Sequence, residues 1–376
     1  MTKEIKRIDS LQVVRALAFL GVFTSHSGIT LFSPGGVWGV SVFFILSGFL
    51  MTYSYFYTDR LSECGVKCCI NFGISKIRKL YPLHIVMLLV AVPLLLRNAI
   101  GLSGLKRFYI PSIEAIINAL LIQAWFPNKD IYNSLNGVSW YLSVSLFLYI
   151  LFPLIICIVR RYKSKWPAYG VIVITLIIQF LFGFISCLLE KSFSLDGFVH
   201  WFVYIFPLSR LEDFIIGVNL GYIFVNSKGD KESSLVKGTF LEITIVIFLI
   251  VQWIAYLVNS HNTISSAVLD PTMAPENWWT LSGYWTISSC ALVYLFALNR
   301  GVISRFLTNK VLLFIGNCSA NAFLIHKMVF SYLYIFESKV FFDIYRYPTT
   351  IICFIITIVC AYMWKRIKNS MIKQKR

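Results

Sequence analysis

The chain has 376 residues, of which 58% are hydrophobic, 16% are aromatic and only 14% are charged. Soluble domains carry about 25% charged residues, so this composition excludes a soluble globular protein. The net charge of +17 would suit a nucleic-acid partner, but the basic residues lie in short loops between apolar runs, as is typical of membrane topology. We therefore predict a single all-α integral membrane domain over residues 1–376, with the lipid bilayer and not nucleic acid as its partner.

Apolar runs of membrane length recur along the chain and predict a polytopic helical bundle of about ten transmembrane spans. We place these spans at about 11–32, 36–57, 80–96, 139–159, 167–189, 198–225, 239–258, 278–298, 311–335 and 348–364. The apolar stretch 113–126 is too short to cross a bilayer, so we expect it to be re-entrant or interfacial. Ten spans place both termini on one side, and Lys and Arg are concentrated in the loops of that side, which predicts cytoplasmic termini.

The first apolar run follows a basic N-terminus and in this respect looks like a secretory signal peptide. It contains Arg15, however, and no small-residue cleavage site follows it. We expect this run to be retained as the first span of a multi-pass inner-membrane protein.

Nine cysteines are scattered along the chain, and three of them, Cys64, Cys68 and Cys69, form a cluster. No second pair of Cys or His residues lies at the spacing of a zinc site. The sequence therefore predicts reduced thiols and no metal site.

Two ionisable residues, Arg15 and His26, interrupt the first apolar run. A charge inside a membrane-length helix costs roughly 3 kcal/mol unless it faces a protein interior or an aqueous cavity, so it usually marks a functional site. Eleven residues of helix turn through about 20° more than three full turns, which places both residues on one face, roughly 16 Å apart. The alternatives are that Arg15 extends to the interface and that His26 bonds a backbone carbonyl in the core.

Two later spans also carry polar side chains. Arg210, Glu212 and Asp213 follow a proline, and they form either a structural ion-pair cluster, which we favour, or part of a cavity wall. Ser319 and His326 are seven residues apart, about 20° short of two helical turns, so they share a helix face. His326 is a second candidate for a general base.

Six short motifs occur in order along the chain. The first is the pair Arg15 and His26, with ten residues between them. The later motifs are Gly39–Phe49, which contains Ser47 and Gly48, then Lys79–Pro82, Ser139–Leu142, Arg210–Gly217 and Gly316–His326. In content and order these motifs resemble the signatures of the family-3 membrane acyltransferases. The resemblance covers nearly the whole chain, and its Leu11-Gln12 start looks most like members that acylate exopolysaccharides.

The resemblance implies an enzyme that moves an acyl group, most often acetyl, from acyl-CoA to a hydroxyl of a cell-surface polysaccharide or its lipid-linked precursor. It implies acetyl-CoA as the co-substrate, a carbohydrate acceptor and no permanently bound cofactor. We expect His26 to be the general base and Arg15 to be the second catalytic residue, which with cytoplasmic basic residues binds the CoA phosphates. The expected substrate-binding residues are Lys76, Arg78, Lys79, Ser47, Trp140, Arg210, Glu212, Asp213, Ser319 and His326.

Two regions depart from the family pattern. Lys76 and Lys79 stand where family members usually carry Arg, and Arg78 is out of register. Lysine keeps the charge of arginine but not its planar fork of donors. Ser145 stands where the family usually has a glutamate, so the role of that carboxylate is either absent or supplied elsewhere in the chain.

Some motif residues also have purely structural explanations. The Ser47-Gly48 pair is typical of a close contact between helices in a membrane. Trp140 and Tyr141 are typical of an interfacial aromatic belt, which we favour over a sugar-binding platform.

Three other functions remain open. A transporter or flippase would line its path with the same buried charges, although the internal repeat found in many transporters is not visible here. An enzyme that uses another donor, such as succinyl-CoA, would want a second cation near His26, and none is evident. A non-catalytic relative would explain the serine at position 145.

Overall fold

The computed structural model describes residues 6–58, 61, 65–101, 104–227, 234–264, 279–281, 283–336 and 345–374. This part of the chain consists mainly of helices and contains no β-strand. The longer helices are α1 (Ser10–Ser25), α2 (Pro34–Tyr55), α3 (Val66–Ile77), α4 (Tyr81–Ala99), α5 (Lys106–Ala119), α7 (Trp140–Val159), α8 (Trp166–Phe193), α9 (Pro207–Asn226), α10 (Leu235–Ile264), α11 (Gly283–Leu298), α13 (Lys310–Phe336) and α15 (Arg346–Gln374). The shorter ones are η1 (Thr30–Phe32), η3 (Gln123–Trp125), α6 (Lys129–Tyr132), η4 (Gly137–Ser139), η5 (His200–Ile205) and α12 (Val302–Leu307).

Six of the described helices are long and apolar enough to cross a membrane, or seven if the bent pair α3 and α4 forms one span. Helices α1 and α11 are apolar but shorter. Each predicted span overlaps one of the longer helices. The prediction of an all-α polytopic membrane protein is confirmed, whereas the count of ten spans and the cytoplasmic termini stay predictions.

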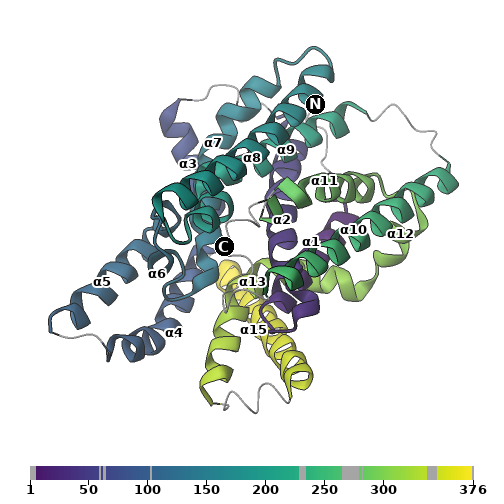
Figure 1. Cartoon of the computed structure of the whole chain (residues 1–376). Coiled ribbons are helices and arrows are strands. Elements are labelled where there is room, and N and C mark those ends of the chain that lie inside the picture. The colour runs from purple at the N-terminus through teal and green to yellow at the C-terminus, as the bar shows by residue number, and fades with distance from the viewer. Residues whose placement is uncertain are drawn as a thin grey trace.

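Helix α2 lies at the centre of the bundle and packs against both α1 and α9 (Figure 1). These contacts are close because glycines meet backbone atoms of the neighbouring helix. A Cβ at Gly35 of α2 would collide with Gly21 of α1. A Cβ at Gly217 of α9 would collide with the carbonyl group of Ile45. Small residues that let helix backbones approach are a common means of association in lipid, where apolar side chains gain little from leaving the solvent.

Helices α1 and α13 pack together and run in the same direction. Near their beginnings, Arg7 Nη2 donates a hydrogen bond to Asn317 Oδ1 at 2.8 Å. Near their other ends, the rings of Phe23 and Phe330 lie 5.0 Å apart, centre to centre. A side chain of α1 and a side chain of α13 that lie about equally far from the start of their helices are therefore at the same level of the bundle.

The connection between the second and third predicted spans is not an irregular loop. It contains α3, which packs against α7 where Gly73 meets Ile150. Helix α3 meets α4 at a bend of 59°. This bend places the short turn 78–80 beside the centre of the bundle.

The stretch 113–126, predicted to be re-entrant or interfacial, is not one continuous helix. Helix α5 ends at Ala119, the backbone turns at Leu121 with a φ of 58°, and η3 follows. Neither piece is among the helices long enough to cross a membrane. Its placement at the membrane interface stays a prediction.

Candidate functional site

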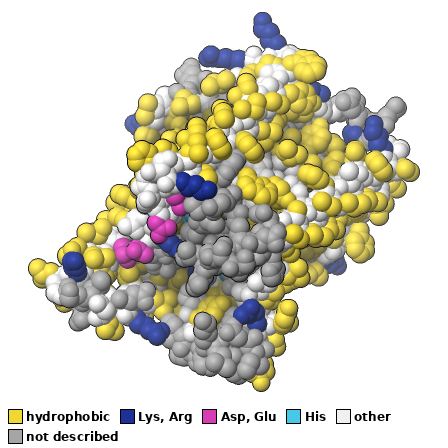
Figure 2. All heavy atoms as spheres, in the orientation of Figure 1, with side chains coloured by type: hydrophobic (Ala, Val, Ile, Leu, Met, Phe, Trp, Pro, Cys, Tyr) yellow, Lys and Arg dark blue, Asp and Glu magenta, His cyan; other side chains and the backbone are white. Residues whose placement is uncertain are grey.

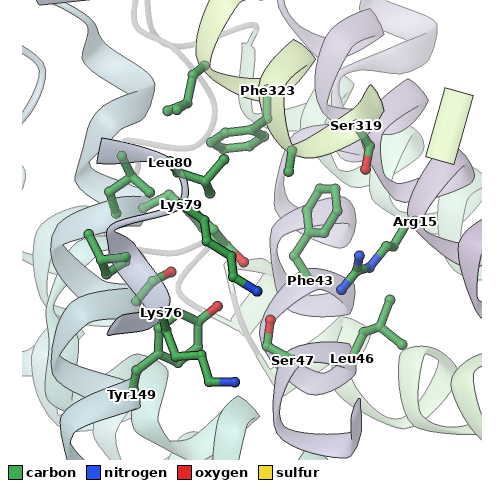
Figure 3. Close-up of a pocket in the computed structure, with 16 residues that line it drawn as sticks. Arg15, Phe43, Leu46, Ser47, Lys76, Lys79, Leu80, Tyr149, Ser319 and Phe323 are labelled. Atoms are coloured by element: carbon green, nitrogen blue, oxygen red, sulfur yellow. The ribbon is translucent and has the colours of Figure 1, made fainter. Parts of the chain in front are cut away.

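A cavity of about 350 Å³ lies between α1, α2, α7, α13 and the turn that joins α3 to α4 (Figure 3). Five of the predicted site residues line it, namely Arg15, Ser47, Lys76, Lys79 and Ser319. In Figure 3 the charged groups of Arg15 and Lys79 approach from opposite sides toward the space beside Ser47. Residues from five distant parts of the sequence thus form one site.

The charge of this lining is entirely positive, and we call it the cationic cavity. Three of its lining residues, Arg15, Lys76 and Lys79, are basic, and none is acidic. Lys76 Nζ donates a hydrogen bond to the Tyr55 hydroxyl at 2.6 Å and lies 4.4 Å from the centre of that ring, so its amino group is held in place. Arg78 is exposed and does not line the cavity. Several cations without a nearby anion favour an anionic ligand.

The Ser47-Gly48 pair forms the close helix contact that its small residues predict, whereas a role of Ser47 in substrate binding stays a prediction. Gly48 lies against the backbone of Phe214 in α9, where a Cβ would not fit. Ser47, which directly precedes Gly48 in α2, lines the cationic cavity. The helix contact therefore fixes the level at which the Ser47 hydroxyl meets the cavity.

Tyr141 is a cavity residue that the sequence alone does not single out. It lines the cavity, its hydroxyl lies near Ser47 and Ser145, and its ring stacks on Phe44 with 4.6 Å between centres. Ser145 also lines the cavity, so the missing family carboxylate falls inside this site. The one signal for Tyr141 in the sequence is its place in the motif around Trp140.

The two candidate bases meet beyond the cavity, along α1 and α13. The rings of His26 and His326 lie 5.0 Å apart, centre to centre, at an angle of 72°. In each ring Nδ1 bonds a backbone carbonyl oxygen, that of Val22 at 2.8 Å and that of Phe323 at 2.7 Å. An imidazole that donates from Nδ1 keeps Nε2 free to accept a proton, as a general base requires.

The two histidines differ in their exposure. His26 is half-buried, whereas His326 is fully buried and its Nε2 has no hydrogen-bond partner in the part of the chain that the structure describes. Among the described residues, no cluster of three His, Cys, Asp or Glu side chains could hold a metal ion.

Aromatic rings separate the cationic cavity from the histidine pair. Phe323 lines the cavity, and its ring lies 5.7 Å from that of His326. The buried ring of Phe19 lies 6.1 Å from His326. Arg15 and His26 both face α13, as their spacing predicts, but aromatic side chains fill the space along that face. Neither histidine lines the cavity itself.

Arg210 and Asp213 form a buried ion pair outside the cavity. Both side chains are fully buried, and Nη1 of Arg210 lies 2.9 Å from Oδ2 of Asp213. Their further hydrogen-bond partners are Ser41, Tyr204, Leu281, Gln179 and Thr286. Glu212 is also buried, but its Oε1 has no hydrogen-bond partner among the described residues. None of the three lines the cavity, which agrees with the structural cluster that we favoured.

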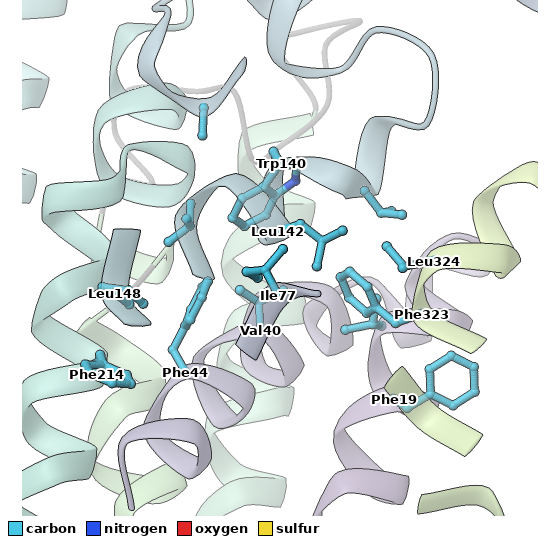
Figure 4. Close-up of a cluster of buried hydrophobic side chains, with 14 of the residues drawn as sticks. Phe19, Val40, Phe44, Ile77, Trp140, Leu142, Leu148, Phe214, Phe323 and Leu324 are labelled. Atoms are coloured by element: carbon cyan, nitrogen blue, oxygen red, sulfur yellow. The ribbon is translucent and has the colours of Figure 1, made fainter. Parts of the chain in front are cut away.

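Trp140 lies in the hydrophobic core (Figure 4). It is only 5% exposed, and its ring lies 5.1 Å from that of Tyr204. The interpretation as a belt residue is therefore wrong, because the ring is enclosed by protein and does not face lipid. Trp140 does not line the cationic cavity either, so the structure separates it from the five predicted site residues that do.

Known proteins that resemble this chain include bacterial acyltransferases. A family model described as an acyltransferase domain matches residues 8–365. A Staphylococcus aureus protein provisionally named an O-acetyltransferase is 26% identical over 348 residues, which are 88% of this chain and 52% of that protein. The O-acetyltransferase OatA of S. aureus is 23% identical over 355 residues, with coverage of 86% and 52%.

The acyltransferase MdmB of Streptomyces mycarofaciens is 26% identical over 243 residues, which are 59% of each protein. The chain spans about half the length of the S. aureus relatives that it matches. No solved structure matches it.

Proposed function

The chain belongs to the acyltransferase family, and from this premise we propose that it is a membrane O-acyltransferase that transfers acetyl from acetyl-CoA to a sugar hydroxyl. We further propose that the acceptor is a cell-surface polysaccharide or its lipid-linked precursor, and that the protein works in the inner membrane. The observation that carries this proposal is the cationic cavity, in which three basic side chains meet without an acidic one.

The cationic cavity suits the coenzyme A part of the donor. Coenzyme A carries a pyrophosphate and a further phosphate, and Arg15, Lys76 and Lys79 offer the cations that bind such groups. Lys79 is exposed at the mouth, whereas Arg15 is half-buried, so the charges extend inward from the surface. The hydroxyls of Ser47 and Tyr141 in the same lining can donate hydrogen bonds to the amide carbonyls of the pantetheine arm.

The histidine pair supplies the base for the transfer. Nε2 of His26 takes the proton of the acceptor hydroxyl while the hydroxyl oxygen attacks the thioester carbonyl. A C–O bond forms, the C–S bond breaks, and the proton then passes from His26 to the departing thiolate of coenzyme A. His326, with its ring 5.0 Å away, is placed to orient His26. Because Phe323 lies between the cavity and His326, the thioester reaches the base only when this ring turns aside.

Purified protein in nanodiscs, supplied with radiolabelled acetyl-CoA and envelope glycan of the host, separates donor binding from transfer. We expect Arg15→Ala to weaken acetyl-CoA binding by about tenfold or more, because a charge-assisted phosphate contact is lost. We expect His26→Ala to bind the donor normally and to slow transfer by about 100-fold or more, as the loss of a general base does. Arg78→Ala, which changes an exposed cation outside the cavity, is the matched control and should match wild type.

A contrary outcome is well defined. If wild type binds and consumes no acyl-CoA while it remains folded, the enzyme proposal fails. A transporter that uses the same buried charges would then be the better explanation.

A further inference from the structure

A second cavity, of about 960 Å³, lies between α4, α5, α6, η4 and α13. It shares no lining residue with the cationic cavity. Its lining contains basic, acidic and amide side chains, among them Arg97, Glu114, Lys129, Asp130, Asn133 and Lys327.

The second cavity adjoins the histidine pair. Lys327, which lines it, directly follows His326 in α13. The hydroxyl of Tyr334, another lining residue, lies beside Gly28, two residues beyond His26. Neither histidine lines the second cavity itself, but each lies close in the chain to a residue that does or that contacts its lining, and the ring of Phe323 lies on the side of the cationic cavity.

A buried hydrogen-bond network lies behind the wall of the second cavity and joins it at Ser134. Asn118 Nδ2 donates to Ser134 Oγ at 2.7 Å, and Ser139 Oγ donates to Asn118 Oδ1 at 3.2 Å. Gln123 Nε2 donates to the same Ser139 hydroxyl at 3.2 Å. Asn136 Nδ2 donates to a backbone carbonyl of α13 at 2.8 Å, which ties this segment to the histidine helix. Bonded polar groups of this kind specify one conformation, because breaking any bond leaves a buried polar group unpaired.

The chemistry of this lining differs from that of the cationic cavity. Glu114 and Lys327 are half-buried and offer an acceptor and a donor from opposite walls, while Asp130 and Asn133 lie at the exposed rim. On the face shown in Figure 2, acidic side chains gather in one group over α6, with basic side chains beside them. A sugar hydroxyl both donates and accepts hydrogen bonds, so a mixed lining of acids, amides and cations suits a sugar better than a polyanion.

We propose that the second cavity binds the acceptor, as a sugar unit with free hydroxyls, and presents it to the histidine pair from the side opposite the donor. This inference rests on the proposed function, because it gives the acetyl group of that reaction its destination. Donor and acceptor then approach the same base through separate openings, and neither has to leave before the other enters.

The test uses the full chain expressed in host cells, with glycan-bound acetate released by mild base as the readout. The first variant is the double change Glu114→Gln and Lys327→Gln, which removes both half-buried charges. The second is Asn133→Trp, which fills the cavity from its exposed rim and leaves every buried group in place. Asp196→Asn changes an exposed acid outside the cavity and is the matched control. Binding of radiolabelled acetyl-CoA is measured on the same purified proteins in nanodiscs.

We expect both cavity variants to lower glycan-bound acetate by at least about tenfold while acetyl-CoA binding stays within about twofold of wild type. Polymer and lipid-linked glycans are analysed separately, and a loss in either supports the inference and identifies the source of the acceptor. Acetate within twofold of wild type in the Asn133→Trp variant overturns it, and so does a loss of acetyl-CoA binding in both variants. If cells that express the wild-type protein carry no more glycan-bound acetate than cells with an empty vector, the proposed function itself fails. This comparison involves no cavity variant, so it is distinct from a failure of the present inference.

Discussion

Replacing Asp213 with asparagine removes one charge of the buried ion pair and keeps the shape of the side chain. In the wild type, Asp213 and Arg210 are both fully buried, 2.9 Å apart, and enclosed by further hydrogen bonds. Removal of one partner of such a pair costs about 3–5 kcal/mol, because the other charge is left in the interior without compensation. We expect Asp213→Asn to lower the free energy of unfolding by about this amount.

Glu212 provides a matched control one residue away. It is an acid of the same helix and only 7% exposed, but its Oε1 has no hydrogen-bond partner among the described residues. Glu212→Gln therefore replaces a carboxyl group by an amide of the same shape without breaking an ion pair, and we expect a change below about 1 kcal/mol. Both variants are compared by denaturant titration in mixed micelles, followed by tryptophan fluorescence. Equal losses in the two variants would refute the reasoning, because burial alone and not pairing would then set the effect.

Two further predictions concern packing and the donor site. Gly217→Ala should lower the free energy of unfolding by about 1–3 kcal/mol, since the new methyl group collides with the Ile45 carbonyl, whereas Gly170→Ala, in open space on α8, should raise it by up to about 1 kcal/mol. The same titration measures both, and a gain from Gly217→Ala would contradict the close packing of α2 and α9. Lys76→Gln should weaken acetyl-CoA binding by about tenfold or more, while the exposed, off-cavity Arg78→Gln should not. Equal effects of these two changes in a filter-binding assay would show that only net charge matters.

The helical membrane fold could be predicted because it depends on local features of the sequence. An apolar run that crosses a bilayer has to be helical, whatever its neighbours are, because only a helix bonds all of its backbone groups within the segment. The helical period also predicts that Arg15 and His26 share a face, and that Ser319 and His326 do so. In the structure the pair from α1 faces the pair from α13. Arg15 and Ser319 line one cavity, and the rings of His26 and His326 are in contact.

Other parts of the site depend on tertiary packing and could not be predicted. Only the family resemblance predicts Lys76 in the site; the residue reaches the cavity because α3 packs against α7 and bends by 59° into α4, and this packing cannot be derived from its own segment. Trp140 and Tyr141 are adjacent and look alike in the sequence, yet one is enclosed in the core and the other lines the cavity. A helix turns by about 100° per residue, so neighbours necessarily point in different directions, and only the surrounding helices decide which direction leads to the site.

The aromatic rings between the two cavities have a consequence for the membrane itself. Polar cavities that approach each other from two directions would form a path for water, and a chain of water molecules conducts protons. The rings of Phe19, Phe23 and Phe323 lie 6.1, 6.2 and 5.7 Å from the ring of His326, centre to centre, and the first two are fully buried or nearly so. These rings would keep such a path dry, so that under our proposal a donor and an acceptor could bind near each other without a leak of protons across the bilayer. The side chains at positions 19, 23 and 323 would then have to block the passage of water and protons as well as pack in the core.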